Sequence, residues 1–392
     1  MTLLLDTSFL AAASAHFVID FLNSMIPLIL AVLSVPLGLS NTTIGLVNAL
    51  AVWTGSLSQP FFGLLVDKAG SKRMATLGIA WMMIAFSLAL IRPGPVSLAL
   101  LVLSVLGSGA FHPAGTMQAT LRGKASFEAR ETTAASFFFL FGQIGLTMGP
   151  VLGGLFADHW GLQGLLITIG LVLPIVMFAV LRWNPSREEP DEKPATLAPL
   201  ASVFAPGVVF FILLTGFRSW TQANMTVFLP KFFSDLGYAP GAYGMIAGLF
   251  MAGSAAGNMV GGWSADRFDS RKVLSACMLL AAIPFILYPS IAETIWVYPI
   301  TILAGFLTGI PHPILVVAAQ RMLPGRVGTA SGIILGLTFA SGSLGTLVSG
   351  LQADRWGFDP VFISTAGIAA VTALLVWGVP KSPLVSAISP KL

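Results

Sequence analysis

The chain has 392 residues, of which 56% are hydrophobic and only 9% are charged. Soluble domains carry about 25% charged residues, so the composition excludes a soluble enzyme, a nucleic-acid-binding protein and a disordered chain. The net charge of +4 therefore concerns orientation in a membrane. The one cysteine, Cys277, allows neither a disulfide within the chain nor a zinc or iron–sulfur cluster.

Apolar stretches recur along the chain, each long enough to cross about 30 Å of hydrocarbon as a helix. There are twelve, at 9–34, 43–66, 74–91, 97–119, 133–155, 162–181, 206–230, 242–264, 273–289, 296–319, 328–350 and 361–379. Helices are expected because backbone groups in lipid must pair within their own segment, and the alternation of a barrel strand is missing. The first stretch lacks a basic start and a cleavage site, so we expect a span and not a signal peptide.

Basic residues predict the orientation. With a cytoplasmic amino terminus, sixteen of the twenty lysines and arginines fall in cytoplasmic segments, and only Arg92, Lys231 and Arg355 fall outside. Cytoplasmic loops are enriched in basic residues. We therefore predict a multi-pass protein of a bacterial inner membrane with both termini in the cytoplasm. The remaining basic residue, Arg218, lies inside a span.

The two halves of the sequence resemble each other. Asp67 recurs as Asp266 at an offset of 199 residues, within the strings Gly-x-x-x-Asp-Lys and Gly-x-x-x-Asp-Arg. A second string, Ala-Asp-x-Trp-Gly, occurs at 157–161 and at 353–357. We predict two six-helix bundles, residues 1–182 and 205–392, joined by a charged, proline-rich cytoplasmic linker at 183–204. Two six-span repeats are the layout of a secondary transporter.

Several motifs resemble those of the major facilitator superfamily. The string Gly63-x-Leu65-x-Asp67-Lys68-x-Gly70-x-Lys72-Arg73 is similar to its signature between spans 2 and 3, with Ser71 where a basic residue is common. The span 5 string Gly145-x-x-x-Gly149-Pro150-x-x-Gly153-Gly154 resembles the antiporter motif of that superfamily. Two further strings resemble the fosmidomycin-resistance family of drug exporters. They are His16-x-x-x-Asp20 and Gly109-Ala110-Phe111-His112-Pro113. The resemblance implies an all-α fold of twelve transmembrane helices and a monomer.

Five ionisable side chains lie inside the predicted spans: His16, Asp20, His112, Arg218 and His312. Such a group costs roughly 2.5–3.5 kcal/mol in a membrane, so it usually faces protein or water and has a function. They occupy spans 1, 4, 7 and 10, which line the central cavity in the architecture that the sequence resembles. The repeat offset places Asp20 opposite Arg218 and His112 opposite His312.

We predict two groups of site residues. Proton coupling is assigned to Asp20 and His16. Substrate binding is assigned to Arg218, His112, His312, Gln222, Asn23, Trp220 and Phe111. The planar guanidinium of Arg218 suits an anionic oxygen, and Asp20 would take up a proton when the substrate anion occupies Arg218. Alternatively, Asp20 and Arg218 form a permanent ion pair, and the histidines only pack between helices. We expect no metal, because the three histidines and Asp20 come without thiolates or a local ligand string.

Other residues are predicted to serve the conformational change. Asp67, Arg73, Asp266 and Arg267 are expected to form a cytoplasmic latch, with each carboxylate facing a helix amino end, near Thr329 and Ser331 or near Thr132 and Thr133. Packing and hinge roles are assigned to Gly145, Gly149, Pro150, Pro113 and Pro313.

The preferred function is a proton-coupled exporter of small organic, fosmidomycin-like anions. A proton-driven importer of an organic or inorganic anion would use the same charges equally well, and a membrane receptor is a third class. No nucleophile–base string, nucleotide loop or metal motif predicts an enzyme or a cofactor. The expected partners are a small-molecule substrate, protons and the lipid bilayer, without nucleic acid.

Overall fold

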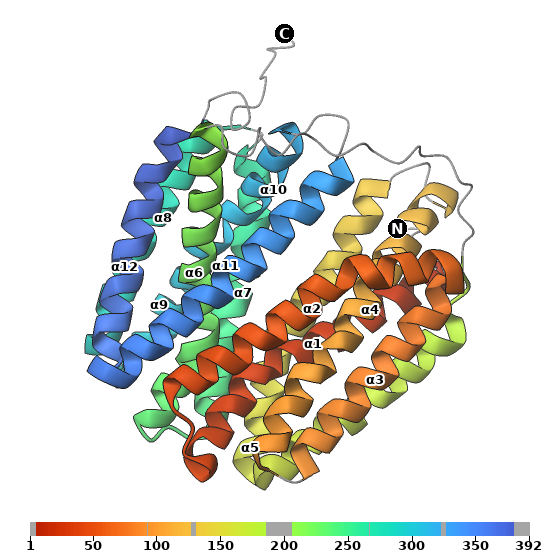
Figure 1. Ribbon diagram of the computed structural model, residues 1–392, viewed down its shortest axis with the longest axis horizontal. Coiled ribbons are helices and arrows are strands. Elements are labelled where there is room, and N and C mark those ends of the chain that lie inside the picture. Colours follow the sequence, from red (N-terminus) through yellow and green to blue (C-terminus); the bar gives the residue numbers. More distant parts are fainter. Residues whose placement is uncertain are drawn as a thin grey trace. The chain divides into compact units, whose positions relative to one another are not determined.

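The computed structural model describes residues 5–91, 93–126, 131–185, 206–265, 267–322 and 327–379. Within these ranges the chain is helical, without strands (Figure 1). The helices are α1 (Thr7–Leu37), α2 (Asn41–Ala69), α3 (Ser71–Ile91), α4 (Pro95–Ser126), α5 (Glu131–Arg182), α6 (Pro206–Asp235), α7 (Pro240–Ala265), α8 (Ser270–Ile291), α9 (Val297–Gly309), α10 (Pro311–Met322), α11 (Val327–Trp356), α12 (Phe358–Leu375) and the short 3₁₀ helix η3 (Val376–Gly378). The predicted linker lies almost wholly outside the described residues.

The predicted spans map onto these helices with two differences. The fifth and sixth stretches run together as α5, which changes direction at Gly161 (φ 59°, ψ −150°). The tenth is divided into α9 and α10 at Ile310. Within the described residues, nine helical segments are long and apolar enough to cross a membrane, and one of them, Ser136–Arg182, covers two of the predicted stretches. The helices α6 and α11 are not among the nine. The all-α membrane fold is confirmed.

The repeated Trp-Gly pair explains two of the helix breaks. Gly161 ends the first half of α5, and Gly357 (φ 78°) separates α11 from α12. Positive φ values cost little only for glycine, because it has no Cβ atom. The chain therefore reverses direction at the same place in both halves.

The described helices divide into two compact units. Unit 1 consists of Met1–Ser40, Leu46–Asp191 and Pro230–Gly248. Unit 2 consists of Asn41–Gly45, Glu192–Leu229 and Leu249–Leu392. Each of α2, α6 and α7 thus contributes residues to both units. The domain boundaries placed in the linker stay a prediction.

In unit 1, α1 is largely buried, and α5 packs on it through glycines. A methyl group at Gly145 would lie 2.3 Å from the Phe17 carbonyl oxygen, and one at Gly149 would lie 2.3 Å from that of Phe21. Such contacts leave no room for a side chain, so glycine is required for this approach. In unit 2, α7 approaches α9 in the same way through Gly253 and Gly257.

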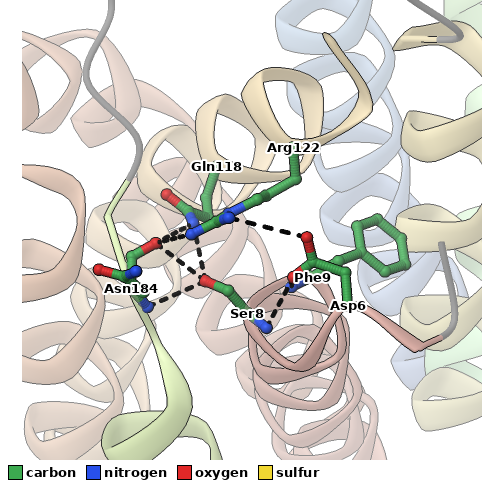
Figure 2. A network of polar contacts seen from close by, with 6 residues as sticks. All are labelled: Asp6, Ser8, Phe9, Gln118, Arg122 and Asn184. Atoms are coloured by element: carbon green, nitrogen blue, oxygen red, sulfur yellow. Dashed lines mark hydrogen bonds and ion pairs between the residues drawn. The ribbon is translucent and has the colours of Figure 1, made fainter. Parts of the chain in front are cut away.

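A polar network ties the start of α1 to the end of α4 and to the segment after α5 (Figure 2). The Asp6 carboxylate caps α1 by accepting from the backbone N–H groups of Ser8 and Phe9, at 2.9 and 3.0 Å. The carbonyl oxygen of Asn184 accepts from Gln118 Nε2 at 2.7 Å and from Arg122 Nη2 at 2.8 Å. These bonds position α1, which carries the site residues of unit 1.

Candidate functional site

Three ionisable side chains converge inside unit 1. His16 and Asp20 lie one turn apart on α1, and His16 Nε2 is 3.1 Å from Asp20 Oδ2. From α4, His112 Nε2 approaches the other carboxylate oxygen, Asp20 Oδ1, to 3.6 Å. One ligand atom of each residue lies within 4.8 Å of the other two. We call His16, Asp20 and His112 the acid cluster.

Backbone carbonyls determine which nitrogen of each histidine carries its hydrogen. Nδ1 of His16 lies 2.8 Å from the Phe138 carbonyl oxygen, and Nδ1 of His112 lies 2.8 Å from that of Ser108. A carbonyl oxygen only accepts, so both Nδ1 atoms donate. When both rings are neutral, both Nε2 atoms are acceptors that face a carboxylate. A proton at either Nε2 or on the carboxylate would pair these acceptors.

The acid cluster is enclosed by rings and by a glycine. His16 is 2% exposed, and its ring stacks on that of Phe138 with centroids 4.1 Å apart. Phe111, predicted as a substrate ligand, is fully buried and packs beside His16, at 6.0 Å between ring centroids. On α5, a methyl group at Gly142 would lie 2.6 Å from Asp20 Oδ2 and 2.7 Å from His16 Nε2. Gly142 was not predicted, although it precedes Gly145 by three residues.

Asn23 belongs to the same cluster of contacts. Its amide Nδ2 donates to Ser108 Oγ at 2.9 Å and to Asp20 Oδ1 at 3.4 Å, while its buried Oδ1 has no partner among the described residues. Asn23 was predicted to bind substrate because it shares one face of α1 with His16 and Asp20. The structure brings it to Asp20. Ser108, one turn before His112 on α4, was missed, although this i, i+4 spacing was its signal.

In unit 2, a buried guanidinium is held by neutral groups. Arg218 on α6 is 4% exposed. Its Nε and Nη2 donate to the Thr308 carbonyl oxygen, at 3.2 and 2.5 Å, and Nη2 also donates to Gln222 Oε1. Gln222 Nε2 in turn donates to Ser254 Oγ at 2.9 Å. Among the described residues of unit 2, no carboxylate forms an ion pair with Arg218.

The carbonyl that Arg218 uses lies at the end of α9, one residue before Gly309. Pro311 and Pro313, at the start of α10, have no N–H groups, so the carbonyls four residues earlier, those of Leu307 and Gly309, lack their usual helix donors. The Thr308 carbonyl lies between these two. His312 lies one turn beyond Thr308, in the first turn of α10.

Two polar residues of α7 were missed in the sequence. Ser254 contacts Gln222, and Asn258 follows Ser254 by one turn. Asn258 Oδ1 is buried without a hydrogen-bond partner among the described residues. Their spacing of four residues within an apolar span could have indicated that both lie on one polar face of the helix.

Trp220, predicted to line the pocket, packs between α6 and α11. Its Nε1 donates to Ser349 Oγ at 3.0 Å, and its ring lies where a methyl group at Gly345 would be, 2.2 Å from Cγ. Trp220 thus joins two helices of unit 2.

The structure gives the positions of most residues predicted to form the hinges and the latch, and their roles stay predictions. Pro113 lies inside an uninterrupted α4, Pro150 inside α5, and Pro313 at the start of α10. Asp67 and Arg73 are exposed. Arg267 stacks over the Trp263 ring at 4.6 Å, and Asp266 lies outside the described residues. So do the side chains of the threonines and the serine expected to receive the two carboxylates.

The acid cluster lies in unit 1, and Arg218 and His312 lie in unit 2. The predicted pairs Asp20–Arg218 and His112–His312 therefore stay predictions.

Comparison with known proteins identifies the family. The model of the Major Facilitator Superfamily matches residues 12–239 and 211–391. The fosmidomycin resistance protein of Escherichia coli (strain K12) is 26% identical over 364 residues, covering 90% of this chain and 87% of that protein. The multidrug resistance protein MdtG of Citrobacter koseri is 26% identical over 357 residues, covering 85% of this chain and 84% of that protein.

Solved structures share the fold. The nucleoside transporter NupG superimposes with a TM-score of 0.76 at 16% identity, covering 97% of this chain and 99% of that one. The D-xylose-proton symporter superimposes with a TM-score of 0.75 at 14% identity, covering 96% and 97%. With the family model matching nearly the whole chain, this protein belongs to the major facilitator superfamily and is a multi-pass membrane transporter.

Proposed function

We propose that the protein is a proton-coupled exporter of small organic anions of the fosmidomycin type, working by alternating access in the inner membrane of a bacterium. The observation that carries the proposal is Arg218, whose buried guanidinium has only neutral partners among the described residues of unit 2. A second feature, the acid cluster of unit 1, supplies the proton site.

The environment of Arg218 favours binding of an anion. Arginine remains charged at physiological pH, and a buried charge is costly unless a counter-charge accompanies it. The Thr308 carbonyl and Gln222 accept from Nε and Nη2, and Nη1 has no hydrogen-bond partner among the described residues, so it can donate to a ligand. A carboxylate or phosphonate oxygen matches this donor. Asn258, one turn beyond Ser254 on α7, can bind a hydrogen-bond donor of the ligand through Oδ1, which has no partner among the described residues.

The acid cluster suits one exchangeable proton. With one proton bound, an ionised Asp20, one imidazolium and one neutral imidazole sum to zero charge. Loss of that proton leaves a net charge of −1 and acceptors facing one another. Each form favours a different arrangement of α1 and α4, so proton binding can bias the conformational equilibrium. Antiport follows when the proton and the anion are bound in alternation.

Relatives support export over import. Two of the curated relatives are called a fosmidomycin resistance protein and a multidrug resistance protein, and resistance to a drug is readily obtained by expelling it. The basic residues place both termini in the cytoplasm, and the protein would act as a monomer without a cofactor. A proton-driven importer is the competing function, and the direction of coupled flux distinguishes the two.

The test is fosmidomycin flux in proteoliposomes under an imposed pH gradient. We expect fosmidomycin to move against the proton flux, and Arg218→Gln and Asp20→Asn to abolish that movement. Arg182→Gln is the matched control, because Arg182 is exposed at the end of α5. Co-movement with protons would establish the importer. Full activity of Arg218→Gln would refute the anion site, and absence of any fosmidomycin flux in wild type would refute the substrate.

A further inference from the structure

The acid cluster presents two imidazoles and a carboxylate at separations that suit a metal ion. His16 Nε2 lies 3.1 Å from Asp20 Oδ2, and His112 Nε2 lies 3.6 Å from Asp20 Oδ1. Two ligand atoms on one tetrahedral zinc ion, each bound at its usual length, are about 3.4 Å apart. The two measured separations lie on either side of this value. One ligand atom from each residue also lies within 4.8 Å of the other two. The cluster is therefore close to the geometry of a three-ligand site.

Hydrogen bonds behind the two rings orient them as metal ligands. Nδ1 of His16 donates to the Phe138 carbonyl and Nδ1 of His112 donates to the Ser108 carbonyl, both at 2.8 Å. The Nε2 atoms of the neutral rings thus carry the free electron pairs, and both face Asp20. Metal-bound histidines nearly always donate their other ring N–H in this way, which fixes the tautomer and the direction of the ring. A histidine that only packs between helices needs no such arrangement.

Asn23 lies beside the carboxylate and offers one more oxygen. Its Nδ2 is 3.4 Å from Asp20 Oδ1, and its Oδ1 is buried without a partner among the described residues. A buried acceptor that stays unpaired is costly. A zinc ion with three protein ligands commonly keeps a water in its fourth position. The Asn23 Oδ1 atom can accept a hydrogen bond from such a water.

The cluster also has room for an ion and a side from which an ion can enter. A methyl group at Gly142 would lie 2.6 Å from Asp20 Oδ2 and 2.7 Å from His16 Nε2, so glycine keeps the space next to both ligand atoms free of a side chain. The side chains of His112 and Asp20 are 23% and 13% exposed. An entry path of this kind is one requirement of a metal site.

We propose that the acid cluster binds Zn²⁺ through His16 Nε2, His112 Nε2 and the Asp20 carboxylate. Imidazole nitrogens with one carboxylate suit zinc, whereas Mg²⁺ prefers an octahedral set of oxygens. All three ligands belong to unit 1. The sequence-based expectation of no metal relied on the absence of a local ligand string. That signal does not detect ligands contributed by two helices that are distant in the chain.

The binding site rests on contacts within unit 1 and depends neither on the proposed substrate nor on proton coupling. Its effect on transport does rest on the proposed function. The ion uses the same acceptor atoms as the exchangeable proton, so a bound Zn²⁺ blocks the proton site. Transport would then be inhibited by zinc.

The test measures Zn²⁺ binding to the full-length protein in detergent, after removal of any affinity tag, by equilibrium dialysis. We expect one Zn²⁺ per chain, which a large excess of Mg²⁺ does not displace. His16→Gln, His112→Gln and Asp20→Asn are each expected to lower the affinity about a hundredfold or more, because losing even a hydrogen bond behind a ligand costs about 10–100-fold. His159→Gln, at an exposed histidine, is the matched control and is expected to bind like wild type.

X-ray absorption spectroscopy of Zn²⁺-loaded wild type carries the test if the variants do not fold. We expect two imidazoles in the first coordination sphere of the metal. Wild type that retains no Zn²⁺, ligand variants that bind it as wild type does, or a coordination sphere without two imidazoles would overturn the site. Neither measurement uses fosmidomycin or a proton gradient, so a failed Zn²⁺ site and a failed transport proposal give different results.

Discussion

His112 Nε2 lies 3.6 Å from Asp20 Oδ1, although the two residues belong to different helices, α4 and α1. The Ser108 carbonyl holds the opposite nitrogen of the same ring. His112 is thus placed between a fixed acceptor and a carboxylate, the position of a group that exchanges a proton. It was predicted as a substrate ligand. That assignment stays a prediction, and from these contacts we further predict that His112 takes part in proton coupling.

We predict that His112→Gln flattens the pH dependence of transport. The glutamine amide can replace the contact of Nε2 with Asp20 but cannot bind the exchangeable proton. Transport rates measured between pH 5.5 and 8.5 are expected to lose most of their variation and to fall about tenfold or more at the optimum. The exposed His159, as His159→Gln, serves as the control. A pH profile shaped like that of wild type would contradict a proton role for His112.

Gly142→Ala is expected to impair the acid cluster without unfolding the protein. The new methyl group would meet Asp20 and His16 at less than van der Waals distance, and such overpacking costs about 1–3 kcal/mol. We expect coupled flux to fall roughly tenfold while thermal stability drops modestly. Gly170→Ala lies on the same helix, where a methyl group meets nothing within 4 Å. Equal effects of the two substitutions would show that Gly142 matters only for helix packing.

The carboxylate introduced by Gln222→Glu is expected to compete with the substrate anion for Arg218. A carboxylate at this position would pair with Arg218, which already contacts the glutamine Oε1. The ion pair would supply the missing counter-charge, so we expect KM for the anion to rise about tenfold, equivalent to about 1.4 kcal/mol, with unchanged or higher thermal stability. Gln222→Ala, which removes the contact without adding charge, gives the comparison. An unchanged KM in Gln222→Glu would argue that the anion does not bind Arg218.

The stabilising effect of Asp354 is expected to depend on pH in a defined direction. Partial burial alone would raise the pKa of its carboxyl group, but the hydrogen bonds from Thr42 and Asn41 outweigh burial and hold the pKa below its ordinary value of 3.8. A depressed folded-state pKa contributes stability above 3.8 that is lost as the pH falls through the lower folded value. The melting-temperature difference between wild type and Asp354→Asn is therefore expected to be constant from pH 8 to pH 5. It should shrink only in stronger acid. A difference that already disappears near neutral pH would contradict this contact.

Part of the site could be derived from spacing alone. His16 and Asp20 share a face of α1 because helical neighbours recur every three to four residues, and Arg218 and Gln222 do so on α6. The repeat likewise marked both copies of the Ala-Asp-x-Trp-Gly string. Spacing could not show that Gly142 covers Asp20, nor that Phe111 packs in the core, since both depend on which helix lies opposite.

Membrane insertion, the all-α architecture and the residues worth studying were determined by the sequence itself. They follow from the cost of burying unpaired backbone groups and charges in lipid, and this cost is paid locally, residue by residue. Only the tertiary structure decided which nitrogen of each histidine faces Asp20, which carbonyl holds Arg218 and which aspartate caps α2. Those outcomes depend on contacts between helices distant in the chain, where differences of a few tenths of an ångström separate a hydrogen bond from a clash.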